Sequence, residues 1–200
     1  MTKLASSLPK SAVAAAIFPD SKEGIEAWAR RYEMDASAAD MKKENELLQL
    51  RDRVRKAGYL TRSQLQRVAQ WKSPRIAGQV GKNSEEFVNE VTRFALSAQD
   101  PRSRIESLTV LDGVMWPMAS VILHFFHADP YPILDFRAIE SMGREVPNQY
   151  NAEFWLNYVN DCRELANRHG VDMRTLDRAL WQFSKSKAGN WPKAATAAAH

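Results

Sequence analysis

A single cysteine, Cys162, is present among the 200 residues. One cysteine excludes an internal disulfide framework, and it excludes a zinc or iron–sulfur site built only from cysteines. Long hydrophobic runs are also missing, since no stretch approaches the roughly 20 apolar residues of a membrane-spanning helix. These absences predict a protein of a reducing, cytoplasmic setting that does not insert into a membrane.

A strong excess of one charge is missing as well. Lys and Arg total 28 against 24 for Asp and Glu, which gives a formal net charge of +4. This mild excess permits a polyanionic partner without requiring one. The 44% hydrophobic and 26% charged residues are ordinary for a globular protein. The length suffices for one sizeable core or for two small lobes that share an interface.

Runs of alternating β-branched residues are not found, whereas helical periodicity dominates. The predicted helices cover residues 22–33, 38–57, 61–71, 84–96, 101–111, 116–127, 135–143, 150–169 and 172–184. A loop that contains Gly78 and Gly81 is expected between the third and fourth of them. Residues 1–20 and the Lys- and Ala-rich residues 185–200 are expected to be flexible. The sequence therefore predicts one all-α domain of eight or nine helices over residues 21–184.

The most informative stretch runs from Leu108 to Gly143. It reads as a helix, a tight turn at 112–114, a second apolar helix, a proline-rich loop and then Asp135 at the start of a third helix. A short turn between two helices leaves backbone N–H groups unbonded at the N-terminus of the second helix. Those groups and the helix dipole suit a phosphate oxygen, bound directly or through a cation. Such a hairpin binds a DNA backbone without reading bases.

This stretch resembles the helix-hairpin-helix motif of the HhH-GPD superfamily of DNA glycosylases, here as a small stand-alone member. The family's hairpin reads approximately L-P-G-V-G-x-x-T-A, and a catalytic aspartate follows after a helix and a loop. The positions that match in register are Leu111, Gly113, Val114 and Ala119. Pro117 stands where bifunctional members have a nucleophilic lysine. Asp135 follows Pro117 at the spacing that separates lysine from aspartate in those members.

Three hairpin positions depart from the family pattern. Asp112 replaces the usual proline, Met115 the second glycine and Met118 the threonine. Because methionine rather than glycine stands at position 115, fewer backbone conformations are open to the turn. The family's iron–sulfur cysteines are absent, so no cluster is expected.

The resemblance implies an HhH-GPD-like fold with helices packed around a central cleft. The hairpin would span residues 104–127, and the catalytic loop and helix residues 128–143. Asp135 would then be the catalytic carboxylate, which stabilises positive charge on the sugar and orients or deprotonates a water. With proline at position 117, the implied enzyme is a monofunctional N-glycosylase that hydrolyses the bond to a flipped-out base.

The implied partner is double-stranded DNA that carries a damaged or modified base. Stand-alone glycosylases also serve in defence against phages with modified cytosines, so repair and defence both remain open by analogy. The protein is expected to be a monomer without an obligate protein partner. No metal or organic cofactor is expected, although a structural monovalent cation at the hairpin is compatible with the resemblance. The base removed, the opposite base and the strandedness do not follow from the sequence.

Several residues outside the hairpin are candidates for the same site. Trp71 and Trp116 offer flat faces to an extruded base, and Lys72 lies beside the first of them. The candidates for contacts with the DNA backbone are Gly113, Val114, Met115, Arg75, Lys82 and Arg137. Gln79 and Asn83 are candidates for insertion into the duplex.

Simpler interpretations stand beside these. Asp135 read alone is a favourable helix N-cap, which would leave a non-catalytic DNA-binding module. Another lysine, Lys72 or Lys82, would give a glycosylase with lyase activity, and a helical protein-interaction domain is a further alternative. His124 and His127 are expected to be structural, although their spacing would also suit a metal pair. The residues expected in the core are Trp155, Tyr158, Cys162, Trp181 and Phe183.

Overall fold

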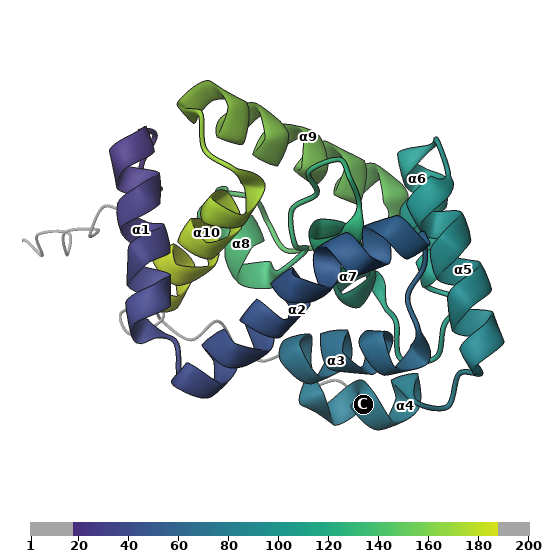
Figure 1. Cartoon of the computed structure of the whole chain (residues 1–200). Coiled ribbons are helices and arrows are strands. Elements are labelled where there is room, and N and C mark those ends of the chain that lie inside the picture. Colours follow the sequence, from purple (N-terminus) through teal and green to yellow (C-terminus); the bar gives the residue numbers. More distant parts are fainter. Residues whose placement is uncertain (1–17, 188–200) are drawn as a thin grey trace, which may run out of the picture.

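The computed structural model describes residues 18–187, and all regular secondary structure in this range is helical, as predicted. The described residues form ten α-helices and one short 3-10 helix, η1, and Figure 1 shows how the α-helices are arranged. Their bounds are α1 Lys22–Asp35, α2 Ala38–Ala57, α3 Arg62–Lys72, η1 Pro74–Ile76, α4 Ala77–Val80, α5 Glu85–Ser97, α6 Pro101–Leu108, α7 Trp116–Phe126, α8 Phe136–Ser141, α9 Ala152–His169 and α10 Met173–Lys187. The expected flexible ends lie outside the described residues at 1–17 and 188–200.

Local sequence signals set most helix boundaries. The Thr61 side chain accepts from the backbone N–H of Gln64, whose own side chain accepts from the backbone of Thr61, so α3 begins with a capping box. Gly58 and Gly170 adopt left-handed conformations at the ends of α2 and α9, with φ of 77° and 60°. These predicted boundaries are confirmed.

The prediction of a loop around Gly78 and Gly81 is wrong in part, because this segment contains η1 and α4. Gly78 lies inside α4, and Gly81 has φ −67°, so neither glycine uses the left-handed conformation open to it. Val80 is fully buried at the end of α4 and packs beside Gly113 of the hairpin turn. Tertiary packing therefore orders a segment whose own sequence favours a loop.

Two predicted helix ends also shift. The helix expected to run to residue 111 ends at Leu108, after which Val110 N and Leu111 N donate to carbonyls three residues earlier. These tight turns reverse the chain before α7. At the other end of the chain, α10 continues through Lys187 rather than stopping at residue 184.

The core is centred on α7, in which every residue from Met118 to Phe126 is buried. A helix that is apolar on all sides needs neighbours on all sides. α2, α3 and α6 pack on it, and in Figure 1 α2 crosses in front of it. α1, α8 and α10 lie to one side of α7, and α3 to α6 lie to the other. Among the helices of residues 18–187, none has the length and apolar content to cross a membrane.

The expected core residues are confirmed with one exception. Trp155, Tyr158 and Cys162 are fully buried, and Phe183 nearly so. Burial raises the pKa of the Cys162 thiol far above its ordinary value. Trp181 is only half-buried and lines a pocket, so its assignment to the core is wrong.

Candidate active site

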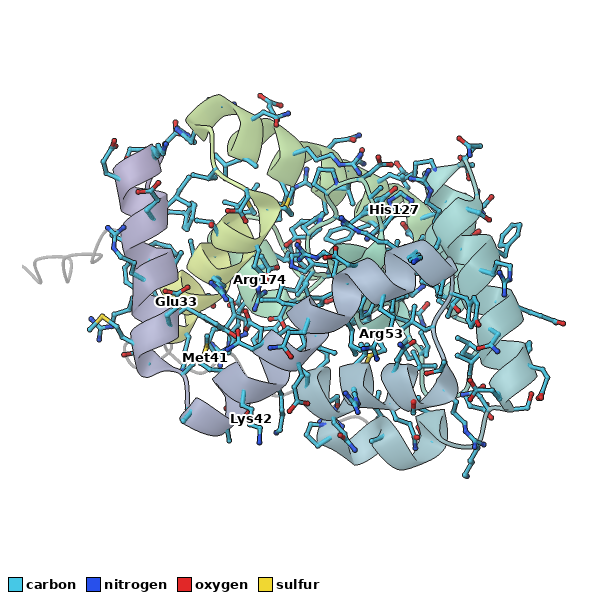
Figure 2. The ribbon with its side chains drawn as sticks, in the orientation of Figure 1. Glu33, Met41, Lys42, Arg53, His127 and Arg174 are labelled. Carbon is cyan, nitrogen blue, oxygen red and sulfur yellow. The ribbon has the colours of Figure 1, made fainter. Side chains whose placement is uncertain are left out.

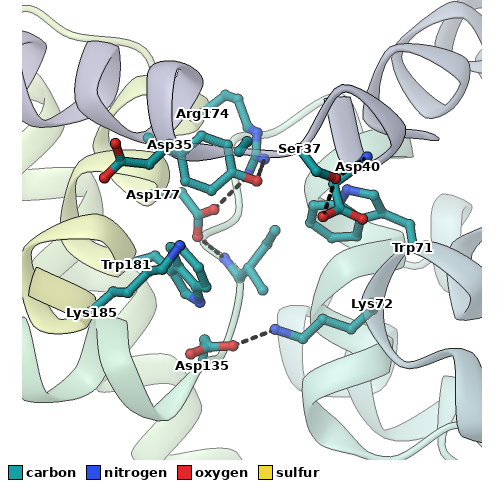
Figure 3. A pocket seen from close by; sticks show the side chains of 13 residues that line it. Asp35, Ser37, Asp40, Trp71, Lys72, Asp135, Arg174, Asp177, Trp181 and Lys185 are labelled. Carbon is teal, nitrogen blue, oxygen red and sulfur yellow. Dashed lines mark hydrogen bonds and ion pairs between the residues drawn. The ribbon is translucent and has the colours of Figure 1, made fainter. Parts of the chain in front are cut away.

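A pocket of about 300 Å³ lies where α10 faces the end of α3. The corner between α1 and α2 and the segment before α8 complete its walls (Figure 3). The residues that line it are Tyr32, Asp35, Ala36, Ser37, Asp40, Trp71, Lys72, Ile133, Asp135, Arg174, Asp177, Trp181 and Lys185. The volume is at the lower end of the range for small-molecule sites.

Asp135 caps α8 and also faces this pocket. Its Oδ1 accepts from the backbone N–H of Arg137 at 3.1 Å, and its Oδ2 accepts from Lys72 Nζ at 2.6 Å. The side chains of Asp135 and Lys72 are 15% and 18% exposed, so the pair is sheltered but open to the pocket. Asp135 is thus an N-cap through Oδ1, while its Oδ2 pairs with Lys72 at the pocket.

The segment that presents Asp135 is fixed by buried hydrogen bonds. Leu134 N donates to Ser120 Oγ of α7 at 2.8 Å, and Tyr158 Oη of α9 donates to the Ile133 carbonyl at 3.1 Å. The side chains of Ser120 and Tyr158 are fully buried. Rigid support of this kind holds a functional side chain in one geometry.

His124 supports the same segment from α7. Its Nδ1 donates to the Tyr131 carbonyl at 2.6 Å, and burial lowers the pKa of the ring to about 3, so the ring is neutral. His127 Nδ1 accepts from Asp129 N at 2.9 Å. Across residues 18–187, no three His, Cys, Asp or Glu side chains are grouped so as to hold a metal ion. Through these hydrogen bonds both histidines contact the segment that follows α7.

A buried ionic cluster forms the inner wall of the pocket. Asp177 accepts from Ile133 N at 3.1 Å and from Arg174 Nη1 at 2.5 Å. Arg174 lies in the interior between α2 and α10 (Figure 2) and also pairs with the fully buried Glu44 at 2.5 Å. Burial raises the pKa of Asp177 to about 6, although Arg174 opposes that shift.

The raised pKa of Asp177 predicts a pH-dependent contribution to stability. Because this pKa rises from 3.8 to about 6 on folding, the contribution is complete below the unfolded value and is lost as the pH rises through about 6. Relative to Asp177→Asn, the wild type should lose up to about 3 kcal/mol of unfolding free energy between about pH 4 and about pH 7. Urea denaturation at both pH values measures this, and equal pH dependence in the two proteins would contradict it.

Two tryptophans face the pocket from opposite sides, Trp71 from α3 and Trp181 from α10 (Figure 3). The Lys72–Asp135 pair lies along the wall between them. Lys185 Nζ lies 4.8 Å from the centre of the Trp181 ring. Aromatic faces across a pocket suit a flat ring. Trp116, expected in this pocket, does not line it and instead begins α7.

A turn joins α6 to α7 at the position where the sequence predicts the hairpin. Gly113 has φ 78°, and a Cβ there would lie 2.9 Å from Val80 Cγ2, so this position requires glycine. α7 begins with no side-chain hydrogen bond at its N-cap residue, Met115, and has Pro117 in its first turn. Val114 N donates to the Leu111 carbonyl at 3.0 Å, so Val114 does not offer that group to a phosphate.

Asn83 is 4% exposed and holds the hairpin turn from behind. Its Oδ1 accepts from Asp112 N at 2.9 Å, and its Nδ2 donates to the carbonyls of Val80 and Asp112. A side chain so engaged is not available to enter a duplex, and that expectation for Asn83 is corrected. Gln79 is exposed beside Gly113.

The remaining backbone-binding candidates fall into two places. Arg75 and Lys82 are exposed on either side of α4, whereas Arg137 lies at the pocket, its guanidinium 5.8 Å from the Trp181 ring. Met115 is 69% exposed at the hairpin. The hairpin and α4 therefore form one surface, while Arg137 belongs to the rim of the pocket.

Sequence reasoning missed four pocket residues of α10, which are Arg174, Asp177, Trp181 and Lys185. Their spacings of three and four residues place them in one stripe along a helix, and charged side chains interleaved with tryptophan were the available signal. Tyr32, Asp35 and Asp40 reach the pocket from the α1–α2 corner, which no local pattern indicates. Comparison of the chain with protein-family models, with curated proteins and with solved structures finds no match.

Proposed function

We propose that the protein is a DNA glycosylase of the HhH-GPD type, with Asp135 as its catalytic carboxylate. One observation carries this proposal. Asp135, at the predicted spacing from the hairpin, lines a pocket of about 300 Å³ with tryptophans on two sides. A pocket with aromatic side chains on two sides and an acidic group at its wall suits an extruded base and its sugar.

The chemistry follows from the position of the carboxylate. Cleavage of an N-glycosidic bond develops positive charge at C1′ of the sugar. A base held between Trp71 and Trp181 would place its sugar towards the pocket mouth, where the Asp135 carboxylate stabilises that charge and activates a water. The rigid segment 131–134 supports this role, because it fixes the carboxylate before substrate arrives.

In this proposal, the hairpin binds the DNA backbone. The N-terminus of α7 lacks a side-chain cap, which leaves its dipole and backbone amides for a phosphate. Arg75 and Lys82 are exposed in the neighbouring segment, and Gln79 lies beside the turn, where it could fill the space of a flipped base. Asp112, which replaces the family's proline, is exposed in the same turn, and its negative charge disfavours a bound phosphate.

Replacing Asp112 by Asn should therefore strengthen DNA binding. Removal of one negative charge beside a phosphate is expected to raise affinity about two- to fivefold at low salt, with less effect at high salt. The backbone of residue 112, which Asn83 holds, is unchanged by the substitution. Fluorescence titration of a duplex at two salt concentrations measures the effect, with Asp52→Asn on α2 as the control for net charge. Equal affinity of the wild type and Asp112→Asn at low salt would argue against the hairpin as the DNA contact.

The decisive experiment is incubation of the protein with duplexes that contain alkylated purines, deaminated bases, oxidised guanine or glucosylated hydroxymethylcytosine. Release of a free base, followed by alkaline cleavage at the abasic site, is the expected result. Release from none of them, with DNA binding intact, would favour a non-catalytic DNA-binding module.

A glycosylase with lyase activity is a second candidate, favoured by the Lys72–Asp135 contact of 2.6 Å. An amine at that place could attack C1′ itself, although position 117 holds proline. Borohydride would then trap a covalent adduct between protein and DNA. Base release without a covalent adduct would support the hydrolytic glycosylase over the lyase.

A further inference from the structure

We infer that Lys72 is the proton donor to the departing base. This inference rests on the proposed function. Lys72 is the last residue of α3, and its ammonium lies in the pocket wall beside the carboxylate that faces the sugar. An ammonium has three N–H donors, so a hydrogen bond to Asp135 leaves others to face the base.

The other cations of the pocket are less suited to this role. Arg174 donates to Asp177 and Glu44, and a guanidinium does not release its proton at the pH at which proteins work. Lys185 lies over the face of Trp181, and the ammonium that pairs with Asp135 is that of Lys72. Lys72 alone combines a transferable proton with direct contact to the carboxylate.

The contact between Lys72 and Asp135 also closes the catalytic cycle. When the bond between C1′ and the base nitrogen breaks, its electron pair stays on the nitrogen, which takes a proton from Lys72 Nζ. A water then bonds to C1′ through its oxygen and gives a proton to Asp135. That proton passes from the carboxyl group to the neutral Lys72 amine across the 2.6 Å contact. Both side chains return to their starting forms, and the net reaction consumes one water.

Lys72→Arg tests this inference, because it keeps the positive charge and the ion pair with Asp135 but not an acid that releases its proton. On whichever duplex of the panel the wild type cleaves, Lys72→Arg should release base about 10²-fold more slowly in single-turnover assays. Lys56→Arg, the same change on the exposed surface of α2 and outside the pocket, should stay within about threefold of the wild type. Equal DNA affinity and equal thermal midpoints for the three proteins show that the fold is intact.

Chemical rescue separates proton donation from charge alone. Ethylammonium should restore activity to Lys72→Ala, whereas tetramethylammonium, which carries charge without a proton, should not. Wild-type rates in Lys72→Arg, equal rescue by both salts, or no rescue by ethylammonium would overturn the inference. Those outcomes would leave the glycosylase proposal intact, since base release by the wild type tests that proposal separately.

Discussion

Asp135→Asn is expected to slow base release by about 10³-fold without weakening DNA binding. The carboxylate is the group proposed to lie beside the sugar, and an amide neither neutralises a cationic sugar nor takes a proton from water. The substitution spares the fold, because Asn is as good an N-cap as Asp, and its Oδ1 can still accept from the backbone N–H of Arg137. An activity loss without a stability loss is therefore the signature of catalysis.

Single-turnover assays on a duplex that the wild type cleaves measure the first effect, and fluorescence titration of the same duplex measures binding. Asp52→Asn is the matched control, because Asp52 is exposed on α2 and outside the pocket. It makes the same change in net charge and should leave both quantities unchanged. Full activity in Asp135→Asn would show that Asp135 is a helix cap without a catalytic role.

Glu44→Ala is expected to lower the free energy of unfolding by about 3–5 kcal/mol, the largest stability effect predicted for this protein. Glu44 is fully buried, and its carboxylate accepts from Arg174, from Arg178 and from Tyr32 Oη at 3.0 Å. Burial alone would raise the pKa of Glu44, but the two guanidinium groups outweigh it and hold that pKa below its ordinary value. Without the carboxylate, two arginine charges remain buried with too few partners.

Urea denaturation near neutral pH measures this loss. The matched control is Glu106→Ala, since Glu106 pairs with Arg102 on the surface and the two side chains are 40% and 63% exposed. An exposed pair contributes about 1 kcal/mol or less. If the free energy of unfolding falls no more in Glu44→Ala than in Glu106→Ala, the contacts of Glu44 with α1 and α10 do not stabilise the fold as predicted.

The linear sequence predicts most helices of the fold for a local reason. Capping at Thr61, left-handed termination at Gly58 and the apolar run of 116–127 depend on hydrogen bonds and burial within one element. The turn before α7 and the start of α8 at Asp135 are also predicted, because a glycine in a tight turn and an aspartate at a helix N-cap are local signals. Prediction fails where contacts with distant residues determine the local structure. An example is α4, which packs against the turn before α7 although Gly78 lies within it and Gly81 follows it.

The sequence by itself determined the all-α class, most of the helix boundaries and the position of Asp135 at the start of α8, because each depends on residues a few positions apart. Only the tertiary structure decided that Lys72 touches Asp135, that Trp181 faces the pocket and that Asn83 holds the hairpin turn. The physical reason is distance along the chain. Contacts between residues 63 positions apart, as Lys72 and Asp135 are, exist only after α3 and the segment before α8 have packed on α7, and no local pattern encodes that packing.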